Sequence, residues 1–250
     1  MDIEICVDSV ESAIAAERGG AQRVELCSAL SEGGVTSSSG LIRRVRSAVA
    51  FDLFVIIRPR GGDFVYSRTE FDVMRQDIRD AQTLGTNGVV LGVLTADGRV
   101  DQERTRMLVQ LARPLSVTFH RAFDACKDLD QALEDVIACG ADRLLTSGGF
   151  SDALRGADRI AHLHAAAAGR IRIMAGGGIR TSNVVPLVQR TGIRDVHSSL
   201  NNNRDSPEAE RRPAKSPLQP AATPYFIVRE DDVRAFKAAL DPPSTNARTE

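Results

Sequence analysis

The sequence has no tryptophan, and aromatic residues make up only 4% of its 250 positions. Single-stranded nucleic acid is commonly bound by stacking bases on aromatic side chains, so the composition argues against that class of protein. Neither sign of charge is in excess, because 32 Lys and Arg stand against 33 Asp and Glu, for a formal net charge of −1. We therefore expect neither a nucleic acid nor a membrane surface as a partner.

Cysteine is also scarce, and its four positions (Cys6, Cys27, Cys126 and Cys139) contain no CxxC pair. This spacing excludes a disulfide-rich secreted scaffold and is typical of a reducing compartment. The N-terminal stretch MDIEICVDSVE is acidic where a signal peptide would be basic, and no long apolar run follows it. We expect a soluble, cytoplasmic protein.

Short stretches rich in β-branched residues alternate with longer stretches of helical periodicity. The predicted strands are 3–6, 23–27, 53–57, 88–91, 115–119, 143–146, 171–174 and 195–197. The predicted helices are 9–18, 41–49, 70–84, 102–111, 129–139, 152–167 and 182–190. Such alternation indicates a parallel sheet. Eight strands, with no dinucleotide-binding fingerprint after the first, favour a single-domain (β/α)8 TIM-like barrel over the alternative, a doubly wound sheet.

A weak internal repeat supports the barrel. Glycines at positions 20, 85, 140 and 192 each follow a predicted helix, and a short polar turn leads from each into the next strand. We expect these glycines to end their helices in the left-handed conformation.

The segment 201–224 differs from the rest of the chain, because it holds five of the ten prolines and almost no large apolar residues. This composition predicts an irregular insertion into a barrel that spans residues 1–240. Ordered structure is expected again at 225–228 and at 231–240, the latter as the eighth helix. Residues 241–250 are expected to form a flexible tail.

Lysine occurs at only three positions, Lys127, Lys215 and Lys237, and none of them lies in a predicted strand. Barrel aldolases that form a Schiff base need a desolvated lysine at a strand end. That enzyme class is excluded.

Polar residues gather instead at the carboxyl ends of the predicted strands, where barrels bind their ligands. They are Glu4 and Cys6, Glu25 and Cys27, Arg58 and Arg60, His120 and Arg121, and His197 and Ser198. Side chains two residues apart share one face of a strand, so Glu4 and Glu25 should point into the barrel mouth, with Arg58, Arg60 and Arg121 to neutralise them. Such a cluster forms either a structural ion-pair network or a ligand site, and we favour the ligand site.

The run AGGGI at 175–179 follows the seventh strand. Loops after the seventh and eighth barrel strands often bind phosphate through backbone N–H groups, although a tight turn is the simpler interpretation. The candidate anion site comprises Gly176, Gly177, Gly178, His197, Ser198, Arg58 and Arg60.

Six motifs carry a resemblance to a known family. They are IEIC at 3–6, RVELC with the following SEGG within 23–34, IIRPRGGDF at 56–64, VTFHRAFD at 117–124, LLTSGG at 144–149 and DVHSS at 195–199. In this order they resemble the copper homeostasis protein CutC family, from residue 2 to about residue 199 and again over 225–240. The resemblance implies a cytoplasmic TIM-like barrel with a role in copper tolerance and copper binding. The chain departs from the family pattern mainly at 200–224.

Carried over by position, Cys6 and Cys27 are the family's cysteines in the first two strands. Cu(I) prefers soft thiolate ligands, and two cysteines at matching height on adjacent strands would reach one ion. The alternative is that both are small buried residues of the barrel, and no Met-rich segment supports copper handling. We also expect a homo-oligomer, a dimer.

The same cluster supports a function of a different class. An enzyme acting on a small phosphorylated or carboxylated metabolite would use Glu4 or Glu25 as acid or base and His120 as a proton shuttle. Arg121 and the other arginines would then clamp the anion. A barrel that binds a ligand without chemistry is the third possibility.

Overall fold

A computed structural model describes residues 1–200, 202–204 and 225–241. Eight parallel strands close into one barrel in chain order. They are β1 (Asp2–Val7), β2 (Arg23–Leu26), β3 (Asp52–Ile56), β4 (Gly88–Leu91), β5 (Ser116–Phe119), β6 (Arg143–Thr146), β7 (Arg172–Ala175) and β8 (Asp195–Ser198). The (β/α)8 barrel predicted from the sequence is confirmed.

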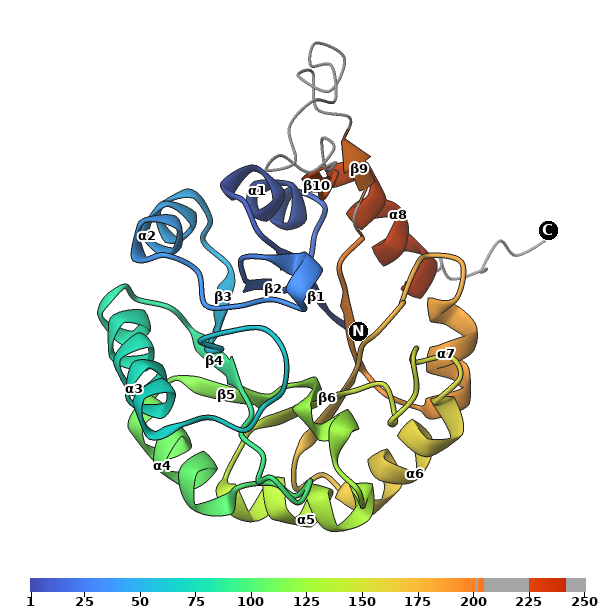
Figure 1. The fold of residues 1–250 in the computed structure, drawn as a ribbon. Coiled ribbons are helices and arrows are strands. Elements are labelled where there is room, and N and C mark those ends of the chain that lie inside the picture. Colours follow the sequence, from blue (N-terminus) through green and yellow to red (C-terminus); the bar gives the residue numbers. More distant parts are fainter. Residues whose placement is uncertain (201, 205–224, 242–250) are drawn as a thin grey trace, which may run out of the picture.

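Helices surround the barrel, as Figure 1 shows. They are α1 (Val10–Arg18), α2 (Ser39–Ala48), α3 (Arg68–Thr83), α4 (Gln102–Ala112), α5 (Leu129–Cys139), α6 (Ala157–Ala167), α7 (Val184–Thr191) and α8 (Glu230–Leu240). The α8 helix lies between α7 and α1 and completes the ring. None of the helices in the described residues has the length and apolar composition that spanning a membrane requires.

The α3 helix shows how the sequence builds one of these units. Ser67 and Glu70 form a capping box at its start, which satisfies two backbone N–H groups that the first turn leaves free. Its residues Phe71, Met74 and Ile78 recur at helical spacing and are buried against the barrel. The amphipathic pattern therefore sets both the helix and the face that it buries.

Helix α6 begins later than the periodicity predicts, at Ala157 instead of residue 152. Local hydrogen bonds account for the difference. The Asp152 side chain accepts from the Arg155 N–H at 2.9 Å, and the Gly156 N–H donates to the Asp152 carbonyl at 3.2 Å. These contacts hold the preceding residues in turns.

The predicted glycine turns are present. Gly140 and Gly192 end α5 and α7 with φ of 83° and 70°, a conformation that other residues seldom adopt. Each turn leads directly into the next strand.

The segment 201–224 falls largely outside the described residues, as do residues 242–250 of the predicted tail. Its residues 202–204 form a short strand, β9 (Asn202–Arg204), which pairs in antiparallel fashion with β10 (Tyr225–Ile227). The two strands stand apart from the barrel sheet.

Alternation along the strands separates two buried layers. Ile3, Ile5 and Val24 belong to the large core between strands and helices, whereas Cys6 and Cys27 pack with Phe54, Ile56 and Val90 inside the barrel. Register then sets the neighbours of each inward residue. Glu4 lies opposite Arg23 on one side and His197 on the other, and Cys6 lies opposite Glu25.

Candidate functional site

A cavity of about 240 Å³ opens at the carboxyl ends of the strands. Its lining includes Cys6 and Glu25 from β1 and β2, Arg58 and His120 after β3 and β5, and His197 from β8. Residues that lie far apart in the sequence therefore meet in one place. Its size suits a small ligand, since the volume lies just below the range of about 300–1,000 Å³ that is usual for small-molecule sites.

Two cysteines meet at the floor of the cavity. The Sγ atoms of Cys6 and Cys27 are 3.5 Å apart, and both residues are buried. Cys6 faces the cavity, whereas Cys27 lies behind it and contacts the Val7 carbonyl. The hydrogen bond with Cys27, together with burial and the nearby Glu25, raises the pKa of the Cys6 thiol well above its usual value.

A carboxylate–imidazole–carboxylate chain runs beside the two cysteines. The Nδ1 atom of His197 lies 2.7 Å from Glu4 Oε1, and its Nε2 lies 3.8 Å from Glu25 Oε2. Burial alone would raise the pKa of Glu4, but the Arg23 guanidinium and the His197 hydrogen bond hold it well below its usual value. Burial opposes the charge on His197, but Glu25 and Glu4 raise its pKa overall.

Cys6, Glu25 and His197 each offer a ligand atom, and these three atoms lie within 4.8 Å of one another. The sequence predicts a different role for each of them: Cys6 in a metal site, Glu25 in a catalytic pair and His197 in an anion site. The structure brings them together as one group, with Cys27 beside it. His197 therefore joins the candidate metal ligands.

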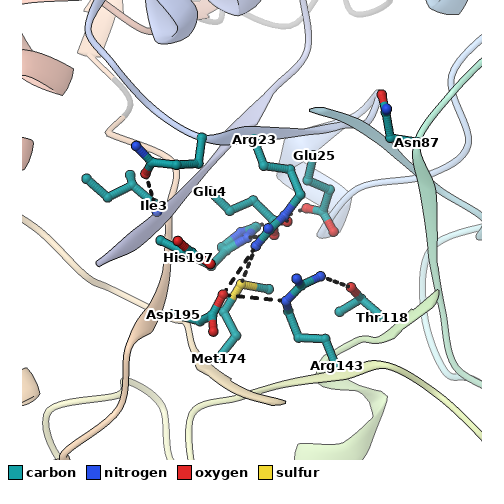
Figure 2. Close-up of polar contacts among 12 residues, drawn as sticks. Ile3, Glu4, Arg23, Glu25, Asn87, Thr118, Arg143, Met174, Asp195 and His197 are labelled. Carbon is teal, nitrogen blue, oxygen red and sulfur yellow. Dashed lines mark hydrogen bonds and ion pairs between the residues drawn. The ribbon is translucent and has the colours of Figure 1, made fainter. Parts of the chain in front are cut away.

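Arg23 is the principal cation that faces Glu4, which corrects the expectation that Arg58, Arg60 and Arg121 would neutralise the buried glutamates. Arg23 forms a buried ion pair with Glu4 and also contacts Met174 Sδ at 3.4 Å. Figure 2 shows this cluster inside the barrel. Alternation along β2 places Arg23 on the same face as Glu25 and Cys27, so the sequence carried a signal for it.

A second buried arginine lies deeper in the barrel. Arg143 lies 3.6 Å from Asp195 Oδ1 and donates to Thr118 Oγ1 at 3.3 Å, and Arg23 lies 3.8 Å from the same carboxylate (Figure 2). Charged side chains that pair with one another therefore also lie beneath the cavity floor. A structural ion-pair network and a ligand cavity are both present, one beneath the other.

Arg58 is buried at the rim of the cavity. Its guanidinium donates to the carbonyls of Glu32, Gly34 and Gly62 at 2.7–2.9 Å, and its Nε has no partner. Among the described residues, no carboxylate forms an ion pair with it.

His120 lies close to Arg58 and is also buried. Its Nδ1 accepts the Ala122 N–H at 3.2 Å, so the proton belongs on Nε2, which has no acceptor. Burial and the Arg58 charge lower the pKa of His120 to about 3, so the ring is neutral. Gly92 makes room for the ring, because a Cβ there would lie 2.6 Å from it.

The two remaining predicted arginines differ in position. Arg121 lines the cavity, where it pairs with Asp124 at 2.7 Å and donates to Ser147 Oγ at 2.8 Å. Arg60 does not line it, because Asp63 and Glu70 hold its guanidinium at 3.0 and 2.6 Å. The structure does not bring Arg60 to the candidate anion site.

The glycine run reaches the cavity through Gly177 and Gly178. Gly176 lies one residue too early, since its N–H donates to the Thr146 carbonyl at 3.0 Å. The Ser198 hydroxyl is also occupied, because it donates to the Ile179 carbonyl at 2.7 Å. Ser198 and Ser199, the last two residues of the DVHSS motif, both line the cavity.

Comparisons with known proteins agree with this architecture. The family model described as CutC family matches residues 1–202. A family protein CutC of Chromobacterium violaceum is 46% identical over 242 residues, which are 96% of this chain and 98% of the relative. The human copper homeostasis protein cutC homolog is 50% identical over 204 residues, which are 82% of this chain and 75% of the human protein.

A solved structure of CutC from Streptococcus agalactiae superposes with a TM-score of 0.76 at 32% identity, covering 80% of this chain and 98% of that one. The family match, the relatives and the fold all lead to the same assignment: this chain belongs to the CutC family.

Proposed function

We propose that this protein binds a single Cu(I) ion at the floor of the cavity, through the thiolates of Cys6 and Cys27 with His197 as a third donor. The observation that carries the proposal is the 3.5 Å separation of the two sulfur atoms. At that separation, one ion could contact both thiolates with little movement of the strands. The human relative is named a copper homeostasis protein, which supports copper as the metal.

The donor chemistry fits Cu(I). Thiolates are soft ligands that select Cu(I), and imidazole also suits copper. His197 resembles many metal-binding histidines, because one ring nitrogen is hydrogen-bonded to a carboxylate, Glu4, at 2.7 Å. The other nitrogen belongs to the same group as Cys6 and Glu25.

Burial shapes the expected affinity. Both thiols must lose their protons before they bind, and the raised pKa of Cys6 opposes this at neutral pH. Binding is therefore expected to be modest for a thiolate site. A reducing compartment, the cytoplasm, suits both Cu(I) and the four free cysteines.

An anaerobic Cu(I) titration against a competing chelator tests the proposal. The wild type should take up one equivalent of copper, and the double variant Cys6→Ser with Cys27→Ser should take up none. The matched control replaces the other two cysteines, Cys126 and Cys139, with serine and should bind as the wild type does. Equal uptake by both double variants would refute the proposal.

A second candidate function is chemistry on a small anionic metabolite in the same cavity. The observation that favours it is the chain from Glu25 through His197 to Glu4, which provides adjoining proton acceptors and donors. Burial and the nearby Glu4 raise the pKa of Glu25, as expected for a general acid or base. Turnover of a small phosphorylated or carboxylated compound that Glu25→Gln abolishes would support this function, and copper uptake without any such turnover would exclude it.

A further inference from the structure

The loops after β7 and β8, on the side of the cavity that adjoins β1, carry backbone amides without a partner among the described residues. Within the described residues, the N–H groups of Gly177, Gly178 and Ser199 donate to no acceptor. All three residues line the cavity. Gly177 and Gly178 have φ of 105° and 67°, so successive N–H groups can form a concave nest of the kind that binds anions.

Two buried side chains supply an independent observation. His120 is 5% exposed and Arg58 is 4% exposed, and each has one nitrogen, His120 Nε2 and Arg58 Nε, without an acceptor. A buried donor without a partner is costly, and native proteins seldom retain one without a reason. Both residues line the same cavity as the free amides.

Two arginines that line the cavity have no ionic partner among the described residues. Within the described residues, Arg58 and Arg180 form no ion pair, and both line the cavity. Glu25 and Cys6 lie together at the floor, within 4.8 Å of the His197 donor. The cavity therefore carries unpaired positive charge from Arg58, after β3, and from Arg180, after β7, while Glu25 and Cys6 lie at its floor.

We propose that this cavity binds a small phosphate monoester, with its phosphate on the Gly177, Gly178 and Ser199 amides and an oxygen of its organic part on His120 Nε2. Several convergent amides match the oxygens of a phosphate, and Arg180 adds charge. The Nε2–H group of His120 is a neutral donor, which suits a hydroxyl or carbonyl oxygen. The cavity of about 240 Å³ limits the organic part to a few carbon atoms.

Calorimetric titrations of the metal-free protein test this proposal, with sn-glycerol 3-phosphate and inorganic phosphate as the two probes. Because no copper is present, a failure here is independent of a failure of the Cu(I) site. We expect saturable binding of both probes, with the ester tighter by about tenfold because it gains the His120 hydrogen bond. Because inorganic phosphate has no organic part to reach His120, its affinity measures binding by the amide nest alone.

Three substitutions locate the site. Ser199→Asp places a negative charge beside the nest and should lower the affinity for both probes by about a hundredfold or more. Ser199→Asn introduces a side chain of the same size as Asp but without the charge. It should bind both probes within about fivefold of the wild-type affinity. Ser47→Asp, on α2 away from the cavity, should leave both affinities unchanged.

His120→Phe separates the two parts of the ligand. It should reduce the affinity for the ester to that for inorganic phosphate and leave inorganic phosphate unchanged. Absence of saturable binding, or equal binding by Ser199→Asp and Ser199→Asn, would overturn the proposal. Equal affinities of the wild type for the two probes would overturn the assignment of an ester.

Discussion

His197 is oriented by Glu4, whose Oε1 atom lies 2.7 Å from the Nδ1 of the imidazole. Glu4 is fully buried and paired with Arg23, so its carboxylate stays charged and accepts the Nδ1 proton. The remaining nitrogen, Nε2, then points toward Glu25 and the cavity floor. A hydrogen bond within the barrel thus determines which nitrogen a ligand meets.

Replacing Glu4 with glutamine should weaken Cu(I) binding by about 10- to 100-fold, the usual cost of losing a carboxylate behind a histidine ligand. Competition titrations of the two proteins measure the ratio. Asp195→Asn is the matched control, because Asp195 also faces Arg23 but has no contact with His197. If Glu4→Gln keeps the wild-type affinity, His197 is not a copper ligand.

Copper affinity should rise with pH. The Cys6 thiol has a raised pKa and keeps its proton through the neutral range, and binding as thiolate must release that proton. Each released proton contributes about a tenfold gain in affinity per pH unit. Titrations between pH 6 and 8.5 measure the slope, and an affinity that stays flat over this range would contradict thiolate ligation by Cys6.

Arg23→Leu should destabilise the protein by about 3–5 kcal/mol, because it leaves the Glu4 charge buried without its partner. The side chains of Arg23 and Glu4 are 4% and 0% exposed. Arg170→Leu, which breaks an ion pair with Glu134 whose side chains are 44% and 51% exposed, should cost less than about 1 kcal/mol. Urea unfolding measures the loss of unfolding free energy in both variants. Similar losses would show that burying an ion pair does not raise the cost of breaking it.

His120 should make the fold sensitive to acid. Its pKa is about 3 in the folded protein against 6.5 for the ordinary side chain, so the unfolded chain binds a proton that the folded one does not. Between these values, stability must fall as the pH falls. From pH 7.5 to 4.5, this one group should remove about 3 kcal/mol of unfolding free energy.

Urea unfolding at these two pH values tests that contribution. His120→Phe should lose less stability on acidification than the wild type does, by about 3 kcal/mol. His164→Gln, on the exposed face of α6, should retain the wild-type loss. An unchanged loss in His120→Phe would show that His120 titrates normally in the folded state.

The barrel could be predicted from the sequence because its signals are local. The helical periodicity of 70–84 and the glycines that end α5 and α7 each act within a few residues. The start of α6 could not be predicted in this way, because the Asp152 turn competes with periodicity over the same residues. Short side-chain hydrogen bonds settle such boundaries.

The site could be predicted only in part, because its partners come from different strands. Strand alternation places Glu4, Cys6, Glu25 and Cys27 inside the barrel, but it does not reveal that His197 inserts between Glu4 and Glu25. The arginines show the same limit. Arg60 was expected at the mouth, yet Glu70 and Asp63, which are close in sequence, hold it away. Register and local pairing decide these contacts.

The most direct test of the copper site is X-ray absorption spectroscopy of the Cu(I)-loaded protein. We predict a spectrum with two sulfur ligands and one nitrogen ligand, unchanged when Cys126 and Cys139 are replaced with serine. The variant in which Cys6 and Cys27 are both replaced with serine should retain no copper and give no copper absorption edge. A copper centre with only nitrogen and oxygen ligands in the wild type would contradict a site built on the Cys6–Cys27 pair.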